Sequence, residues 1–296
     1  MAFPSIPAPA WSPTNREYHA LTERWSSSML ADFRASPALA HGRYVTKSIE
    51  REPPTPSMIC GSLVNILLLE PDRAKSHIAV AEVQSRNSKA FRDLDGTAPI
   101  VVTRPEMDRA LAVADAIQNP RTKAAEVAAA LLLGPGISEY AHKWEEGEIP
   151  CKCMVDKLAM FPTGEPVQVE LKTTTDPRPQ PFAATVDRYG YDAQAAFNLR
   201  GIQHALGGFL PRFYWIAVRN EPPYEVHVSQ LSEEFHALGE QQIERDLKGL
   251  GARLSGAAPW CSEDEQLLSG SIPALEPPRW RLRELYSGRT TAIDTF

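Results

Sequence analysis

Residues 151–175, CKCMVDKLAMFPTGEPVQVELKTTT, constrain the fold of this chain more than any other segment. Lys152–Phe161 and Glu165–Thr174 are rich in valine, phenylalanine, methionine and threonine, which favours β-strands. Between them, the PTG at residues 162–164 has a proline that suits the start of a type I turn and a glycine that suits a third loop position at positive φ. The segment therefore predicts a β-hairpin with a three-residue loop.

The length of this loop sets the register of the hairpin. Phe161 then faces Glu165, and Asp156 faces Glu170, so that the two carboxylates share one face with Cβ atoms ~4.5–5.5 Å apart. A four-residue loop would shift the pairing by one residue and place the two acids on opposite faces. The glycine position favours the first register.

Side chains alternate along the second strand in agreement with this register. Apolar side chains occupy one face, toward the core, at Val167, Val169 and Leu171. Polar side chains occupy the other face, toward an expected cleft, at Gln168, Glu170 and Lys172. Two opposed carboxylates repel unless a cation lies between them, and their hard oxygen atoms suit Mg²⁺ or Mn²⁺. Such a metal can polarise a phosphoryl oxygen and activate water, while Lys172 orients that water or stabilises charge on the phosphate. The alternative is a solvated face with an ordinary surface ion pair.

Several segments carry a resemblance to a known family. VDKL followed by VELKTT resembles the PD-(D/E)XK nuclease superfamily, with valine where its proline often stands. Further segments are similar, in order over about residues 17–285, to the phage and prophage exonuclease VIII family. These segments are EYHALTERWSSSMLADFRASP, GSLVNILLLEPD, GISEYAHKW, YGYDAQAAFNLRGI, FYWIAVRNEPPYEVHVSQL and IPALEPPRW. The resemblance implies an α/β fold with a restriction-endonuclease-like core, in which helices flank a central mixed β-sheet.

The resemblance also implies roles for residues in and near the hairpin. Asp156 and Glu170 hold metal, the Leu171 backbone carbonyl adds a ligand, and Lys172 positions or activates water. Glu139, ahead of the hairpin, supplies a further acidic group near the metal. Its alternative is a helix-terminal surface glutamate.

Two predicted helices add candidates to the site. Tyr191, Gln194 and Asn198 share one helix face by their spacing, and the resemblance implies that Gln194 lies beside the metal as a catalytic residue. The family usually has a histidine where GSLVN places Asn65. An asparagine amide is a weaker metal ligand than histidine, so Asn65 is a candidate ligand that puts full activity in question.

The implied substrate is the end of double-stranded DNA. Ser26 and Ser28 lie where related exonucleases grip DNA, and a helix N-terminus with free amides binds phosphate well; the alternative is a helix cap only. Tyr191 is a third candidate DNA contact. The resemblance implies a Mg²⁺-dependent exodeoxyribonuclease, with Mn²⁺ as an alternative, that resects linear duplex DNA from a 5′ end. It would leave 3′ single strands for a single-strand annealing protein, and would assemble as a homo-oligomeric ring.

Two alternatives stay open. The first is a catalytically weak or inactive DNA-binding phage accessory protein with the same fold, which the asparagine at position 65 and the acidic composition would favour. The second is an endonuclease of the same fold. The net charge of −6 over 296 residues is unexpected for a protein that binds nucleic acid, although net charge hides local clustering and metal ions offset acidic sites.

The chain has a simple predicted organisation. Residues 1–16 form a flexible, Pro-rich arm, residues 17–288 a single nuclease domain, and residues 289–296 a tail. Helices are expected at Ser28–Ala40, from Leu63 to Leu69, at Arg104–Leu133 with a break near Asn119-Pro120, at Asp187–Leu206 and at Ser232–Leu254. Besides the hairpin, strands are expected at His77–Gln84, Phe213–Val218 and Glu225–Val228. Residues 48–58 are expected to form a loop.

Cysteine usage and hydropathy suggest a cytoplasmic protein, and the resemblance implies a bacterial or phage-infected cell. The four cysteines, at positions 60, 151, 153 and 261, form no paired CxxC pattern, so reduced thiols are favoured over an iron–sulfur cluster. The N-terminus has no signal-peptide pattern. The longest apolar runs, near Ile66–Leu69 and Val127–Leu133, are too short to span a bilayer, so no membrane association is expected.

Overall fold

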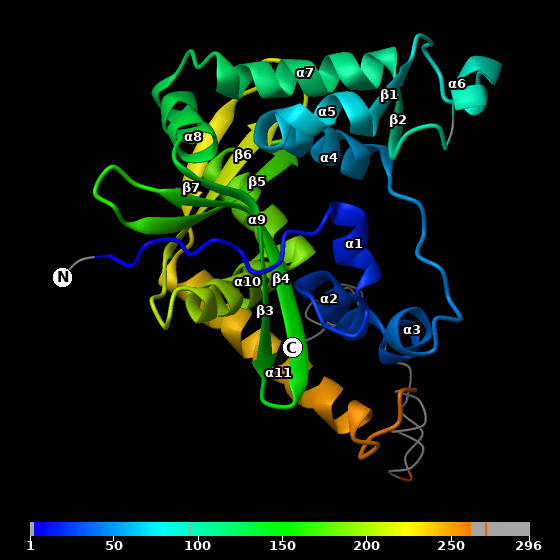
Figure 1. The fold of residues 1–296 in the computed structure, drawn as a ribbon, viewed down its shortest axis with the longest axis vertical. Helices are drawn as coiled ribbons and strands as arrows, with labels where there is room; N and C mark the ends of the chain where they lie inside the picture. The colour runs from blue at the N-terminus through cyan, green and yellow to red at the C-terminus, as the bar shows by residue number, and fades with distance from the viewer. Residues whose placement is uncertain (1–2, 95, 262–269, 271–296) are drawn as a thin grey trace, which may run out of the picture.

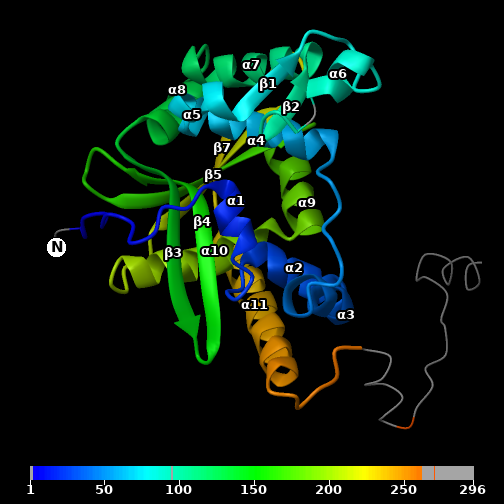
Figure 2. The same ribbon diagram turned by 45° about the vertical axis from the view of Figure 1, so that its right-hand side comes forward.

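A computed structural model describes residues 3–94, 96–261 and 270. Figures 1 and 2 show a central sheet between two groups of helices. Its strand order is β3-β4-β5-β6-β7, and neighbouring strands are antiparallel except for the parallel pair β5 and β6. The strands are β3 (Gly136–Glu146), β4 (Ile149–Met160), β5 (Pro166–Thr174), β6 (Arg212–Arg219) and β7 (Val226–Gln230). A second sheet pairs β1 (Ile78–Ala81) with β2 (Ile100–Thr103) in parallel.

Helices cover both faces of the central sheet. The helices of the described residues are α1 (Asn15–Ala20), α2 (Ser27–Ala35), α3 (Pro37–Ala40), the π-helical turn η1 (His41–Val45), α4 (Pro56–Leu69), α5 (Pro71–His77), α6 (Lys89–Leu94), α7 (Arg104–Gln118), α8 (Lys123–Leu133), α9 (Pro179–Tyr189), α10 (Tyr191–Ala205) and α11 (Glu233–Leu254). One hydrophobic cluster joins α4, α7 and α8 to the face of β5 that carries Val167, Val169 and Leu171. Two further clusters join α2, α9, α10 and α11 to the sheet. The predicted fold class, a mixed sheet flanked by helices, is confirmed.

The predicted hairpin has the predicted register. Ala159 pairs with Val167 and Met160 with Pro166, and the Phe161 amide donates to the Glu165 carbonyl at 2.9 Å. Gly164 has a φ of 83°, the left-handed conformation that the third position of such a loop requires. The local turn chemistry was therefore sufficient to fix which residues of the two strands face each other.

Gln168 departs from the prediction that its side chain faces a cleft. It is fully buried, and neither polar atom of its amide has a hydrogen-bond partner among the described residues. The reason is tertiary: α10 packs over this face of the sheet, so the polar face of β5 is covered rather than open. Burial of an unpaired amide is costly, and strand alternation does not indicate it.

Two of the predicted helices are divided in the structure. Ser28–Ala40 is broken at Ser36, whose hydroxyl accepts from the Leu39 amide at 3.2 Å as the cap of α3, because a residue before proline disfavours helical geometry. Asp187–Leu206 is broken at Gly190, which takes a φ of 65° between α9 and α10. The predicted break near Asn119-Pro120 is confirmed, since α7 ends at Gln118 and α8 begins at Lys123.

Other differences lie near the ends of the predicted elements. Residues 56–58, expected in a loop, begin α4, because Thr55 caps it and Pro56 fits its first turn. The strands β2 and β3 were not predicted as strands. Within the N-terminal segment, α1 begins at Asn15, and Trp11 stacks on Tyr18 with ring centroids 5.8 Å apart. The predicted tail at residues 289–296, and the family-like IPALEPPRW segment, lie outside the described residues.

Among the described residues, no helix combines the length and the apolar character needed to cross a bilayer. Cys60, Cys151 and Cys153 carry free thiols and are buried.

Candidate active site

Asp156 and Glu170 lie where the hairpin strands separate. The β4–β5 ladder ends at the pair Lys157 and Val169, and the same register continued by one step brings Asp156 beside Glu170. Beyond that point Asp156 Oδ2 accepts a hydrogen bond from the Leu171 amide at 2.6 Å. An acidic side chain thus takes the place of a backbone partner and is held against the strand that carries the second acid.

Glu139 joins these two acids from the neighbouring strand. The pairs Ser138–Lys157 and Tyr140–Val155 flank it, so their register sets Glu139 beside Asp156. Glu139 itself is skipped in the ladder and has a φ of 49°, which is uncommon for a residue other than glycine and costs free energy. Three carboxylates therefore come together across three adjacent strands, β3, β4 and β5, and the alternative of a helix-terminal glutamate is wrong.

Burial and the charges of neighbouring carboxylates raise the pKa values of Asp156 and Glu139. Burial raises the pKa of Asp156 to about 7, and the charge of Glu170 adds to the effect. Burial likewise raises the pKa of Glu139 to about 9, with contributions from the charges of Asp156, Glu70 and Glu170. Because the charged forms repel in a poorly solvated site, a cation that binds between them is favoured.

Lys172 is held against the acids by residues of α10. Its Nζ donates to Glu170 Oε2 at 3.3 Å and to Gln194 Oε1 at 3.2 Å, and it lies 4.9 Å from the centroid of the Tyr191 ring. Burial disfavours the ammonium, but the charges of Glu170 and Asp156 outweigh this and raise the pKa of Lys172. The side chain is therefore a fixed positive charge at neutral pH. It is suited to stabilise an anion and is a poor base.

Two asparagines complete the polar contacts. Asn198 Nδ2 donates to Glu170 Oε1 at 3.2 Å from α10, and Asn65 Nδ2 donates to Asp156 Oδ1 at 3.2 Å from α4. In this arrangement the Asn65 amide supports Asp156 through its nitrogen. The helix face shared by Tyr191, Gln194 and Asn198 was predicted from spacing, but the contact of Asn198 with Glu170 was not.

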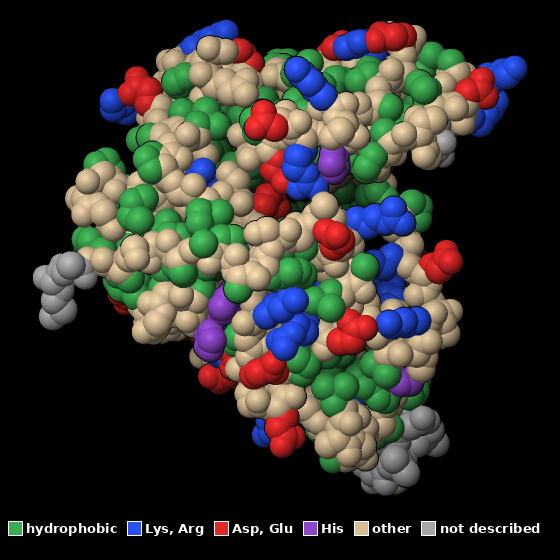
Figure 3. All heavy atoms as spheres, in the orientation of Figure 1, with side chains coloured by type: hydrophobic (Ala, Val, Ile, Leu, Met, Phe, Trp, Pro, Cys, Tyr) green, Lys and Arg blue, Asp and Glu red, His purple; other side chains and the backbone are tan. Residues whose placement is uncertain are grey.

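Glu70 and Arg73 were missed by sequence reasoning. They form an ion pair where α4 passes into α5, and both act electrostatically on Glu139. No pattern in the sequence relates this helix junction to the hairpin, because only the packing of α4 on the sheet brings them together. Figure 3 shows that the surface is hollowed between α5 and the helices α1 and α3, where charged side chains gather.

The donor atoms present fit a hard divalent cation. Each carboxylate oxygen of Asp156 and Glu170 has one hydrogen-bond donor and keeps lone-pair capacity for a metal. Within the part of the chain that the structure describes, no three His, Cys, Asp or Glu side chains form a ready-made metal cage. Mg²⁺ is commonly bound by one or two carboxylates and several waters, so the pair Asp156 and Glu170 suffices. Leu171, Glu139 and Asn65 remain predicted ligands.

The predicted DNA-binding serines lie at the start of α2. Ser26 is buried and caps the helix, with its hydroxyl accepting from the Met29 amide at 3.4 Å. Ser28 is half-buried, and its hydroxyl lies 3.1 Å from that of Ser26. Of the two, Ser28 is therefore the more accessible to a phosphate, and the assignment of both serines remains a prediction.

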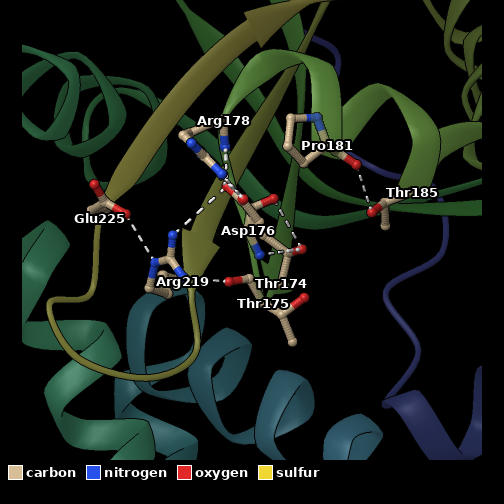
Figure 4. Close-up of polar contacts among 8 residues, drawn as sticks. All are labelled: Thr174, Thr175, Asp176, Arg178, Pro181, Thr185, Arg219 and Glu225. Carbon is tan, nitrogen blue, oxygen red and sulfur yellow. Dashed lines mark hydrogen bonds and ion pairs between the residues drawn. The ribbon is translucent and has the colours of Figure 1, made fainter.

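Polar side chains form a cluster around the segment that follows β5, as Figure 4 shows. Asp176 accepts from Arg178 Nε at 2.9 Å and lies 3.7 Å from the guanidinium of Arg219. Arg219 also donates to the Thr175 carbonyl at 2.7 Å and to Glu225 at 2.9 Å. These contacts hold the passage from β5 to α9 against the end of β6.

A mixed sheet with Asp156, Glu170 and Lys172 on two adjacent strands defines a protein of the PD-(D/E)XK nuclease superfamily, and the predicted relationship is confirmed. The chain belongs to the family described as PDDEXK-like domain of unknown function (DUF3799), which it matches over residues 26–264. Nucleases of this superfamily generally use divalent metal ions.

A solved structure with the same fold is among those similar to this chain. It is the crystal structure of a "putative exonuclease" from Eubacterium rectale, with a TM-score of 0.61 and 12% sequence identity, and the match covers 94% of this chain and 100% of that one. No curated protein matches this chain. Family and fold together support a nuclease.

Proposed function

We propose that this protein is a Mg²⁺-dependent exonuclease that degrades linear double-stranded DNA from the 5′ end. The observation that carries the proposal is the convergence of Asp156 and Glu170 beside the ammonium of Lys172. Direction and end dependence rest on the resemblance to the exonuclease VIII family. The fold of the Eubacterium rectale protein agrees with a nuclease without specifying direction.

Asp156 and Glu170 would hold the metal, with Mn²⁺ as an alternative to Mg²⁺. When bound there, such an ion supplies Lewis-acid polarisation of a phosphate oxygen and a lowered pKa for water. The side chains of the protein contribute the rest. Lys172 places a positive charge next to the metal-binding acids, where it stabilises the negative charge that grows on the phosphate.

The surrounding residues keep Lys172 and Glu170 in place. Gln194 accepts from Lys172 Nζ at 3.2 Å, and Asn198 donates to Glu170 at 3.2 Å. Both lie on α10, so one rigid helix orients the ammonium and the carboxylate together. Preorganised charges of this kind contribute much of the rate enhancement in enzymes that transfer phosphoryl or acyl groups. Glu139 adds a third acidic side chain beside Asp156 and Glu170. A bound cation would stabilise the ionised forms of all three.

The wider proposal concerns partners. Degradation from a 5′ end leaves a 3′ single strand, which a single-strand annealing protein would use in recombination. A homo-oligomeric ring around the duplex and a cytoplasmic location in a bacterial or phage-infected cell complete this proposal. A non-catalytic DNA-end-binding protein is the second candidate, because Asn65 donates to Asp156 where the family usually has a histidine.

Linear DNA is expected to be degraded in Mg²⁺ and left intact in EDTA. The assay compares a linear duplex labelled at either 5′ or 3′ ends with a covalently closed circle of the same sequence. Early release of short 5′-labelled products, with the 3′ label kept on long strands, is the expected result. Asp156→Asn protein controls for contaminating nuclease.

The other outcomes each identify an alternative. Nicking of the closed circle would identify an endonuclease. Binding of linear ends with no cleavage in Mg²⁺ or Mn²⁺ would identify the non-catalytic protein, and early release of the 3′ label would reverse the direction.

A further inference from the structure

Two tyrosines stack at the junction of α9 and α10. Tyr189 is the last residue of α9, Tyr191 is the first of α10, and Gly190 between them has a φ of 65°. This left-handed turn brings the two rings together, with centroids 5.8 Å apart and planes at 28°. The side chain of Tyr189 is nevertheless 61% exposed. An exposed aromatic ring is thus held in a fixed orientation by a second ring.

The stacked pair Tyr189 and Tyr191 contacts the candidate active site through Lys172. Tyr191 presents its ring to Lys172 Nζ at 4.9 Å, and Lys172 contacts Glu170 at 3.3 Å. Two successive contacts therefore connect the exposed ring to the ammonium. Bases rise ~3.4 Å per step along a duplex strand, so Tyr189 lies within reach of the first few nucleotides on either side of a phosphate held at Lys172.

The fold does not need the Tyr189 ring for its own core. The buried contacts of α9 come from Phe182 and Val186, which pack with Trp215 and its neighbours. Tyr189 points away from that cluster into solvent, at a cost in exposed apolar area. Its removal is therefore expected to leave the packing of α9 intact.

The charge beside the ring suits a nucleic acid. The Arg188 guanidinium lies 5.6 Å from the centroid of the Tyr189 ring, and no carboxylate of the described residues forms an ion pair with it. Arg34 also borders this turn, 3.1 Å from the position of a Cβ on Gly190, but it is paired with Asp246 at 2.6 Å. Arg188 is thus the cation at this turn that is available to a phosphate.

We propose that Tyr189 is a stacking platform for a nucleobase of the DNA strand whose phosphate occupies the site, an inference that rests on the proposed nuclease function. Aromatic side chains bind bases of any sequence through their π-faces. A base inside a duplex has both faces covered, so the ring accepts only a base with an open face, at a DNA end or unpaired. Tyr189 is in this sense a positioning residue that favours ends over continuous duplex.

Fluorescence of 2-aminopurine tests the stack without requiring cleavage. The probe is a linear duplex with 2-aminopurine at one of the first four positions from the 5′ end, mixed with the full-length protein in EDTA or Ca²⁺. We expect quenching at one position by wild-type protein, loss of at least half of that quenching in Tyr189→Ala, and retention in Tyr189→Phe. The control is Leu133→Ala, which removes an exposed apolar side chain from α8. Equal quenching by wild type and Tyr189→Ala, or no quenching at any position, would overturn the proposal.

Kinetics with abasic DNA give a second readout. In Mg²⁺, Tyr189→Ala is expected to raise KM about tenfold on an intact end with little change in kcat, and to show no such difference on a duplex that lacks the stacked base. An equal loss on both substrates would mean a merely structural role. The two proposals fail separately. Quenching that depends on Tyr189, without cleavage, would support the stacking platform and refute the nuclease. Cleavage without such quenching would support the nuclease and refute the stacking platform.

Discussion

Replacement of Asp156 by asparagine is expected to lower DNA cleavage by about 10³-fold or more while it makes the metal-free protein more stable. The loss of activity follows because one of the two carboxylates that fit a metal disappears, and the metal supplies most of the activation of water and phosphate. Rates are measured on end-labelled linear duplex in Mg²⁺. Cleavage within tenfold of wild type would refute the assignment of Asp156.

The gain in stability follows from the raised pKa of Asp156. The folded protein holds this proton up to a pKa of about 7, whereas an aspartate in an unfolded chain has a pKa of about 3.9. The folded state therefore binds more protons between these values, and its stability falls as pH rises from about 4 to about 7. Asparagine does not ionise, so the variant avoids this loss.

Denaturant unfolding in EDTA at pH 5 and pH 8 measures the effect. We expect Asp156→Asn to exceed wild type at pH 8 by about 1–2 kcal/mol, with a smaller difference at pH 5, because water near the site moderates the full linkage. The hydrogen bonds of Asp156 to Leu171 and Asn65 survive if the Asn65 amide turns over to accept from the new amide. Mg²⁺ is expected to stabilise wild type and not the variant. A variant that is less stable than wild type at pH 8 would contradict this account.

The parts of the site that the sequence revealed are those fixed by local chemistry. The turn at residues 162–164 sets the register of Asp156 and Glu170, and strand alternation places Lys172 on the face of Glu170. Helical spacing groups Gln194 with Asn198. Each of these inferences needs only residues within one hairpin or one helix, where turn geometry and periodicity dominate.

The parts that the sequence did not reveal depend on packing between distant segments. The left-handed backbone of Glu139 and its place beside Asp156 come from the pairing of β3 with β4, and β3 was not predicted as a strand. Glu70 and Arg73 reach the site only because α4 packs on the sheet. The division of the helix at Gly190, and hence the tyrosine stack, was also missed, since an isolated glycine is tolerated within a helix pattern at modest cost. In each case tertiary contacts override a weak local preference.

Replacement of Lys172 by methionine is expected to lower cleavage by about 10²–10³-fold and, unlike the change at Asp156, to destabilise the fold. Activity falls because the positive charge aimed at the phosphate is lost. Stability falls because Glu170, only 3% exposed, loses its ammonium partner at 3.3 Å and remains as a buried charge. Removal of one partner from a buried ion pair commonly costs ~3–5 kcal/mol. Because the Lys172 side chain is 16% exposed, we expect a loss of about 2–3 kcal/mol.

A second substitution separates the two effects of the Lys172 change. The double variant Lys172→Met with Glu170→Gln has no uncompensated charge, so it is expected to recover most of the lost stability and none of the activity. Urea unfolding of the four proteins of this cycle, in EDTA, gives the coupling between the two side chains. Lys123→Met is the matched control, because Lys123 pairs with Glu126 at 2.5 Å on the exposed surface, where the loss of an ion pair has little effect. A Lys172→Met protein as stable as wild type, or a double variant no more stable than Lys172→Met, would show that the ammonium does not neutralise Glu170. The electrostatic arrangement proposed for the site would then fail even if the protein cleaved DNA.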